Sequence, residues 1–237
     1  MAKRHIAWGN RAIERFVKKS LNAIQKQLAK AGLLHVRLMK GNDKTGLFCF
    51  TVSLLPVIDC PNCSECKNHC YDVQHDCINK GCFEQRVINH IIHKTDAERY
   101  WREIELQVQA NFVTQLRINV GGDISGIDFE CINEMAKRNP GCDFLFFTKN
   151  YKECNAWLAK HNGEFASNVK CIYSRWPGME CDNPFNMPES HVLWEDGTTT
   201  APEFGAYYCG GNCSECHFKK EGCWVLKKGE HVIFKAH

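Results

Sequence analysis

Two groups of cysteines are the residues of this chain best suited to chemistry. The first group is Cys60-Pro-Asn-Cys63-Ser-Glu-Cys66-Lys-Asn-His-Cys70, followed a little further along by Cys77 and Cys82. The second group consists of Cys209, Cys213, Cys216 and Cys223. Gaps of two or three residues allow one tight loop to turn several thiolates toward a common centre. Both groups therefore predict bound metal, with all of these cysteines as candidate ligands.

The spacing of the first group favours iron–sulfur. C-x2-C-x2-C-x3-C matches the run of bacterial ferredoxins, although Tyr71 follows Cys70 where those proteins have proline, so the ferredoxin fold is not implied. Zinc is the alternative, because C-x2-C pairs are also typical of zinc sites. It is less favoured because those sites usually divide into two separated cysteine pairs. Six cysteines exceed what one zinc ion or one 4Fe–4S cluster needs. Either two centres share this loop, or some of its thiols join the second group at one centre.

The second group begins with C-x3-C-x2-C, a spacing similar to that of radical S-adenosylmethionine enzymes. In those enzymes three cysteines leave one iron open to the cofactor, whereas Cys223 could close the site here. The position near the end of the chain also differs from that family's early motif. Gly121-Gly122-Asp123 is similar to the family's turn that contacts the cofactor, although a simple tight turn explains it as well. Lys149 follows a predicted strand, where α/β folds place ligand contacts. S-adenosylmethionine thus remains an alternative cofactor, with these four residues as its candidate contacts.

The composition of the chain indicates in which cellular compartment these cysteines lie. The chain has 237 residues, sixteen cysteines and a formal net charge of +3, which permits an anionic partner without arguing for one. We find no apolar run of signal-peptide or membrane-spanning length. We therefore expect a cytoplasmic protein, in which grouped cysteines are thiolate ligands rather than disulfides.

The elements that must position the cysteines follow from hydrophobic spacing. Asn10 to Gly32 predicts a helix with one apolar face and a basic opposite face, which is either solvated or able to touch nucleic acid. Residues 33–40 and 47–55 predict strands, and 84–112 predicts helix in two pieces. Strands at 112–120, 143–148, 169–173 and 191–194 alternate with helices at 127–138 and 151–161. This order predicts an α/β protein with parallel strands, an incomplete β/α barrel. We expect residues 1–40 to form a basic helix and strand, and 41–237 the iron–sulfur domain.

Several other residues that could bind metal are more simply explained as surface or core residues. His90 and His93 are three apart on a predicted helix and could reach one metal, but a solvated face is the simpler interpretation. Six cysteines are isolated, and most are expected to be core, because a buried free cysteine behaves as a small apolar residue. They are Cys49, Cys131, Cys142, Cys154, Cys171 and Cys181.

These elements together resemble a phage-encoded family of "gene product" proteins from actinobacterial phages. The shared features are Gly41-Asn-Asp-Lys-Thr-Gly46, Cys70-Tyr71, Arg117 before Gly122-Asp123, Phe147-Thr-Lys149, the terminal cysteines and Val232-Ile-Phe-Lys-Ala-His237. The resemblance implies an iron–sulfur protein with a partial barrel like that of radical enzymes, in the host cytoplasm, without implying a substrate. The basic N-terminal helix and the large number of cysteines depart from the family.

The sequence thus predicts an iron–sulfur protein with a redox, electron-transfer or radical-type role, whose partner is a redox protein or a small molecule. Two alternatives stay open, a zinc-stapled nucleic-acid-binding module and a radical S-adenosylmethionine enzyme. No membrane partner is expected.

Overall fold

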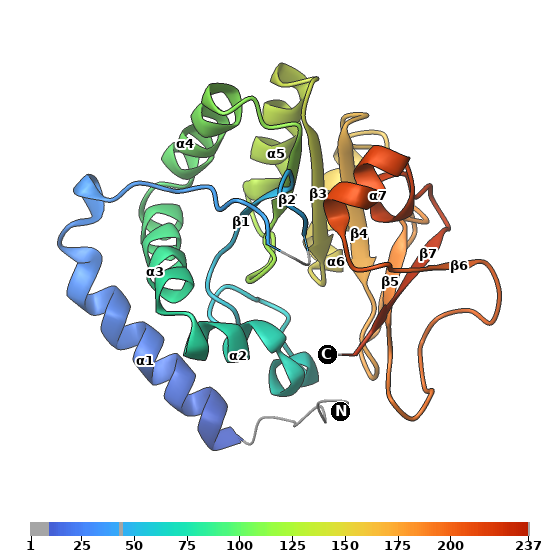
Figure 1. Ribbon diagram of the computed structural model, residues 1–237, viewed down its shortest axis with the longest axis horizontal. Helices are drawn as coiled ribbons and strands as arrows, with labels where there is room; N and C mark the ends of the chain where they lie inside the picture. The colour runs from blue at the N-terminus through green and yellow to red at the C-terminus, as the bar shows by residue number, and fades with distance from the viewer. Residues whose placement is uncertain (1–9, 43–44, 237) are drawn as a thin grey trace.

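The computed structural model describes residues 10–42 and 45–236, which form one parallel sheet with helices around it (Figure 1). The strands are β1 (Phe50–Val52), β2 (Gln115–Ile118), β3 (Asp143–Thr148), β4 (Val169–Ser174), β5 (Glu189–Leu193), β6 (Ala206–Tyr208) and β7 (His231–Lys235). The helices are α1 (Asn10–Leu28), α2 (Tyr71–Ile78), α3 (Lys80–Thr95), α4 (Ala97–Ala110), α5 (Asp128–Arg138), α6 (Tyr151–Lys160) and α7 (Cys213–Lys219). Short 3-10 turns at Ala31–Leu33, Glu65–His69 and Gly222–Trp224 complete the order.

The sheet has the order β1-β2-β3-β4-β5-β7-β6, and every pairing between named strands is parallel. Its edges, β1 and β6, do not pair with each other, so the sheet is open. Parallel neighbours need crossover connections, which α5 and α6 supply between β2, β3 and β4. The predicted α/β class with parallel strands is confirmed.

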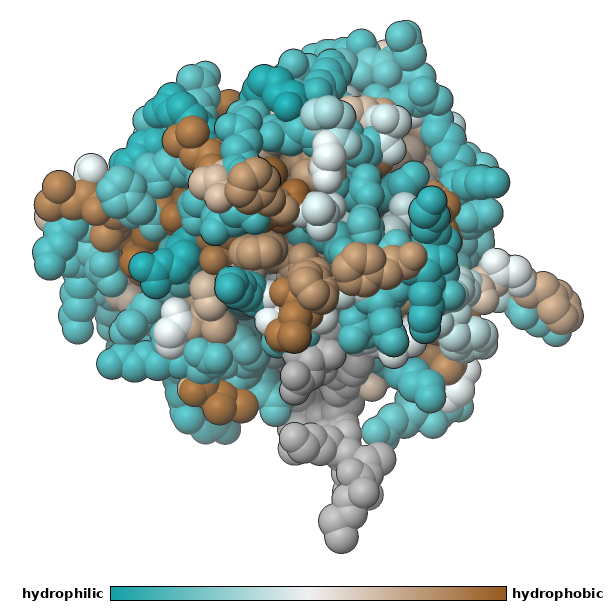
Figure 2. Space-filling view, turned by 45° about the horizontal axis from the view of Figure 1, so that its top comes forward, coloured by the Kyte–Doolittle hydropathy of each residue, from teal (hydrophilic) through white to brown (hydrophobic). Residues whose placement is uncertain are grey.

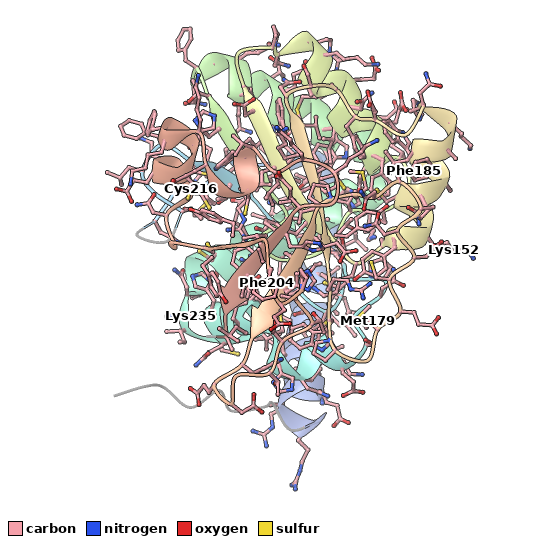
Figure 3. The ribbon with its side chains drawn as sticks, turned by 90° about the vertical axis from the view of Figure 1, so that its right-hand side faces the viewer. Lys152, Met179, Phe185, Phe204, Cys216 and Lys235 are labelled. Carbon is pink, nitrogen blue, oxygen red and sulfur yellow. The ribbon has the colours of Figure 1, made fainter. Side chains whose placement is uncertain are left out.

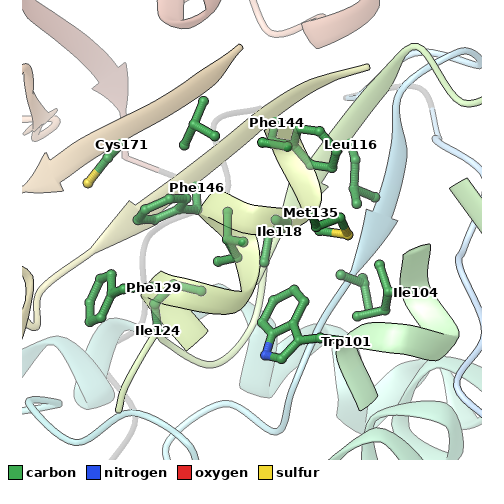
Figure 4. Packing of buried hydrophobic residues seen from close by; sticks show 14 of the residues in the cluster. Trp101, Ile104, Leu116, Ile118, Ile124, Phe129, Met135, Phe144, Phe146 and Cys171 are labelled. Carbon is green, nitrogen blue, oxygen red and sulfur yellow. The ribbon is translucent and has the colours of Figure 1, made fainter. Parts of the chain in front are cut away.

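The main core lies between the sheet and helices α4, α5 and α6. Leu116, Ile118, Phe144 and Phe146 project from β2 and β3 onto this side and are fully buried. Figure 4 shows them facing side chains of α4 and α5, such as Trp101 and Met135. Because side chains alternate across a strand, Leu145 and Ile172 point to the opposite face, where they form a separate core with Trp224. Each face of the sheet therefore carries its own apolar layer.

Helix α1 lies on the outside of α3 (Figure 1). Its apolar face buries Ile13 and Phe16, and Phe16 meets Phe83 of α3 edge to face at 6.1 Å. The predicted amphipathic helix is present, although Leu28 near its end is 49% exposed. On the basic side, the Lys19 ammonium lies 3.9 Å from the Phe83 ring centroid.

The strand predicted at 33–40 is wrong. This segment makes only an isolated antiparallel bridge, between Met39 and Thr51. Its amide groups bond instead to side chains of α4, with Glu103 accepting from the Val36 N–H at 2.8 Å and Gln107 from the Leu38 N–H at 3.0 Å. Side chains of a neighbouring helix thus replace the ladder that the alternating pattern suggested.

Other boundaries moved less. The strand predicted at 47–55 is shortened to β1, because residues before it form a turn that packs against α7. The two-piece helix at 84–112 is confirmed as α3 and α4, whereas α2, α7, β6 and β7 were not predicted. Within the described residues, no helix is long and apolar enough to cross a membrane. The face in Figure 2 mixes hydrophilic and hydrophobic side chains.

Candidate metal centres

The first cysteine group lies in the loop that follows β1 and leads into α2. Cys60, Cys63, Cys66 and Cys70 are all half-buried there. Burial raises the pKa of each thiol, to about 12 for Cys70, and the charges of neighbouring group members raise it further for Cys60, Cys66 and Cys70. The Cys63 thiol donates to the Val57 carbonyl at 3.5 Å, so it points back into the loop. These four thiols therefore lie near enough to affect one another's ionisation.

The turn Gly121-Gly122-Asp123 lies directly against this loop. The Leu54 N–H donates to the Gly121 carbonyl at 2.9 Å, and the Asp123 N–H donates to the Asp59 carbonyl at 2.8 Å. Gly122 has φ +83°, and a Cβ built there would lie 2.7 Å from the Leu54 Cβ. Both the left-handed backbone and the close approach require glycine.

Asp123 and Lys149 lie together beside the first cysteine group. Asp123 accepts a hydrogen bond from the Lys149 N–H at 2.9 Å, and burial raises the pKa of its carboxyl group. The charge of Lys149 lowers the pKa of the Cys63 and Cys66 thiols and partly offsets the effect of burial. All four residues predicted to contact a cofactor thus lie next to the first group.

An aromatic wall stands next to Lys149. The Lys149 Nζ lies 5.9 Å from the ring centroid of Trp176, which packs edge to face on Trp194 at 5.5 Å. His69, one residue before Cys70, contacts Trp194 at 5.2 Å and Trp176 at 5.9 Å. The loop therefore closes against apolar surface on this side.

Cys77 and Cys82, which we predicted as ligands, do not join this group. Cys77 is exposed at the end of α2, and Cys82 lies in the first turn of α3. The pKa of Cys82 is raised by burial, and the next largest influence is the charge of Arg86, which lowers it. Arg86 has a structural role, because it bonds Asp72 of α2 at 2.8 Å and so ties α2 to α3.

The second cysteine group lies on the sheet face opposite the main core. Cys213 and Cys216 belong to α7, which Figure 3 shows with Cys216 labelled, while Cys209 follows β6 and Cys223 lies in the last 3-10 turn. Burial raises the pKa of Cys223, and so do Cys209, Cys213 and Cys216. The Tyr207 hydroxyl lies 3.8 Å from the Cys216 sulfur. These four thiols therefore form a second group.

Cys49 is buried in the core, as expected, and it also joins this second group. It precedes β1, is fully buried, and shares a hydrogen bond with Cys213. That bond is the main reason why the pKa of Cys213 is lowered, and the charge of Arg117 lowers it further. The Arg117 Nη1 donates to the Cys213 sulfur at 3.6 Å. Cys49 lies two residues before Thr51, which pairs with Arg117, so strand alternation was the signal that could have found it.

The turn at 45–49 holds the second group in place. The Ser214 N–H donates to the Thr45 carbonyl at 2.9 Å, and the Ser214 hydroxyl accepts from the Phe48 N–H at 3.2 Å. Gly46 has φ +80°, and a Cβ there would lie 2.4 Å from the Ser214 hydroxyl. This explains why turn residues precede β1, since the turn docks α7 onto the sheet.

The two groups lie at opposite ends of β1, because Cys49 precedes the strand and Cys60 follows it. Among the thiols of these two groups, those that affect each other's pKa belong to the same group. The charges of Cys213 and Cys223, which belong to the second group, raise the pKa of Arg117. Tyr71, which follows Cys70 of the first group, raises it as well. Arg117 thus lies between the two groups.

The family model of Gene product 88 matches residues 12–182 of the chain. The chain belongs to the Gene product 88 family. Comparison with curated proteins and with solved structures gave no match. The Gene product 88 match includes the first cysteine group with Asp123 and Lys149, and it includes Cys49, but it ends before the other four cysteines of the second group.

His90 and His93 do not lie on a solvated helix face, so that prediction is wrong. His93 is buried, and its Nε2 lies 2.7 Å from an Asp128 carboxylate oxygen. The His90 Nδ1 lies 2.9 Å from Asp59, and the His90 side chain is only 12% exposed. The face of α3 that carries them is covered, and each ring finds a carboxylate that compensates for its burial. Both support the elements around the first cysteine group.

Proposed function

We propose that this Gene product 88 protein is a redox protein that holds two iron–sulfur clusters. Cys60, Cys63, Cys66 and Cys70 would bind the first cluster, and the second would be bound by Cys209, Cys213, Cys216 and Cys223. The observation that carries the proposal is that thiols lie near one another in two separate groups, four in the first and five in the second, where Cys49 bonds Cys213. The clusters would supply one-electron chemistry, and the chain's own residues would set their surroundings.

Metal binding would require the buried thiols of both groups to lose their protons. Burial raises the pKa of Cys60 and Cys223, so both are neutral thiols at pH 7 when no cation is near. A bound metal deprotonates a coordinating thiol outright and compensates for the burial of the thiolate. Cys213 departs from this pattern, because Cys49 and Arg117 lower its pKa. It would be the first thiolate available to an incoming metal in the second group.

The spacing of the first-group cysteines along the chain, C-x2-C-x2-C-x3-C, favours iron–sulfur over zinc, whose sites usually divide into two separated pairs. The two kinds of site also differ in how closely they hold their sulfurs. A tetrahedral zinc site with Zn–S bonds of about 2.3 Å holds its sulfurs within about 4 Å of each other. A cubane attaches each cysteine to a different iron, which spreads the sulfurs further apart.

The two sites favour different roles. The second group lies against the buried layer of Leu145, Ile172 and Val232, and four thiols would close its cluster. A sealed cluster in such a place suits electron storage or transfer. The first group lies beside Asp123 and Lys149, whose charged side chains could contact a substrate or redox partner. Arg117 lies beside Cys213 of the second group, so its positive charge would favour the reduced state of that cluster.

Ligand replacement tests the two-cluster proposal. Cys66→Ser and Cys216→Ser each remove one ligand from one cluster and are expected to keep about half of the wild-type iron. Cys77→Ser is the matched control, because Cys77 is exposed and lies outside both groups. Iron and acid-labile sulfide are measured per chain after anaerobic purification. Unchanged iron in both ligand variants, or complete loss of iron in either, would contradict two independent clusters.

A radical S-adenosylmethionine enzyme is the second candidate, and the position of Gly121-Gly122-Asp123 against the first group favours it. One of the four first-group thiols would then have to leave an iron open. The test is to incubate the reduced protein with S-adenosylmethionine and to measure cofactor cleavage in the wild type and in Asp123→Ala. Cleavage that depends on Asp123 would establish this activity, and failure of the wild type to bind the cofactor would exclude it.

A further inference from the structure

Strands β5 and β7 carry a third set of metal-binding residue types, away from both cysteine groups. Glu189 of β5 pairs with His231 of β7, and His191 lies two residues after Glu189. Strand alternation therefore places all three side chains on one face. This face is opposite to the one on which Val232 packs toward the second cysteine group. The cluster is thus separate from both proposed iron–sulfur sites.

The ligand atoms of this set already have coordination distances. The His191 Nε2 lies 3.0 Å from the His231 Nδ1, and each nitrogen lies 3.8 Å from the Glu189 Oε2. Metal–nitrogen bonds of about 2.1 Å separate neighbouring ligand atoms by about 3.0 Å in octahedral and about 3.4 Å in tetrahedral geometry. A cation between the three atoms thus needs only small side-chain shifts.

The surroundings orient two of the three ligands. The His191 Nδ1 lies 2.9 Å from the Thr200 hydroxyl, which leaves the Nε2 directed at His231. Thr200 lies in the connection from β5 to β6, where Figure 3 labels Phe204. Asn183 donates to the other oxygen of Glu189 at 2.9 Å. Such partners on the far side of each ligand are typical of metal sites, because they fix ring orientation and carboxylate rotation.

Burial explains why a cation would be favoured here. The side chain of His191 is 2% exposed and that of Glu189 is 14% exposed, whereas His231 at 25% leaves an approach from solvent. Arg175 is a cation beside this set, and its Nε lies 3.7 Å from the Glu189 Oε2. Arg175 also donates to the Cys181 carbonyl at 3.3 Å, so it keeps a partner when the carboxylate turns to a metal.

We propose that Glu189, His191 and His231 bind one divalent transition-metal ion, independently of the cysteine centres. Two imidazoles and one carboxylate suit zinc and neighbouring first-row metals. Three protein ligands leave at least one coordination position for water or a small ligand, reached from the side of His231. The site neither requires nor excludes iron–sulfur at the thiol groups.

Zinc binding to the full chain, with its cysteine centres reconstituted, tests this site. Isothermal titration with Zn²⁺ is expected to show one equivalent beyond the metal already held. His231→Gln and Glu189→Gln are expected to weaken that binding at least about tenfold. The matched control is His35→Gln, because His35 is an exposed histidine that pairs with Glu103 at 3.4 Å.

Two further measurements make the result decisive. Co²⁺ bound at this site is expected to show no sulfur-to-cobalt charge-transfer band, which separates it from the thiol groups. The iron and sulfide contents of His231→Gln are expected to equal those of the wild type, which separates loss of this site from misfolding. Absence of the extra equivalent in the wild type, or equal Zn²⁺ affinity in His231→Gln, would overturn the proposal.

Discussion

Replacement of Gly122 by alanine is the change that most sharply tests how the fold supports the first cysteine group. Gly122 has φ +83°, and an alanine Cβ would lie 2.7 Å from the Cβ and 3.3 Å from the Cα of Leu54. Leu54 is 1% exposed, so it has no room to retreat. The turn at 121–123 must therefore move away from the loop that carries Cys60.

Two costs add in Gly122→Ala. The left-handed backbone costs about 1–2 kcal/mol for alanine, and overpacking a buried site costs about 1–3 kcal/mol more. We expect a loss of about 2–5 kcal/mol in the free energy of unfolding, measured by urea denaturation of the reduced, metal-free chain. The iron content of the first group should fall with it, because the displaced turn carries Asp123 and its bond to Asp59.

Gly205→Ala is the matched control. Gly205 has nearly the same backbone, with φ +85°, but a Cβ there meets nothing within 4 Å. Only the backbone cost of about 1–2 kcal/mol applies, and iron content should not change. Equal stability of the two variants, or full iron in Gly122→Ala, would refute the reasoning from close packing.

The remaining predictions concern ionisation. Arg117→Gln should raise the pKa of Cys213, because it removes a cation 3.6 Å from the thiolate. Cys213 in the metal-free chain should then be alkylated several-fold more slowly at pH 7. An unchanged alkylation rate would contradict this role of Arg117. Arg138→Gln should cost roughly 0.5–1 kcal/mol at pH 7, since Arg138 bonds Glu105 at 2.8 and 2.9 Å at a partly exposed site. The Arg138 bond lowers the pKa of Glu105, so this stabilisation is complete above about pH 4.5 and is lost as pH falls through the lowered value. Urea denaturation at pH 7 and pH 3 checks the difference, and an equal cost at both would exclude the ion pair as its cause.

The parallel strands could be predicted because each is a short apolar run between helices with a clear period. The strand at 143–148 has the expected bounds, since both of its faces are buried and its residues are nearly all apolar. The strand predicted at 33–40 was wrong because alternation alone does not show whether a neighbouring strand or a helix supplies the hydrogen-bond partners. β6 was missed because its three residues are too few to show a hydrophobic period.

The candidate sites could be predicted where their residues are close in the sequence, and not where distant segments form them. Cys60 to Cys70 lie within one loop, so their spacing in the sequence already carried the geometry. Cys49 is more than 150 residues from Cys209, and only the docking of α7 brings them together. Glu189 and His231 depend on the register of β5 against β7, which no local pattern contains.

Metal and sulfide analysis of the anaerobically purified chain tests the central claim most directly. Two clusters of the 4Fe–4S type predict a coloured protein with about eight iron atoms and about eight acid-labile sulfides per chain. A colourless protein that contains zinc at the cysteines and no acid-labile sulfide would contradict the account.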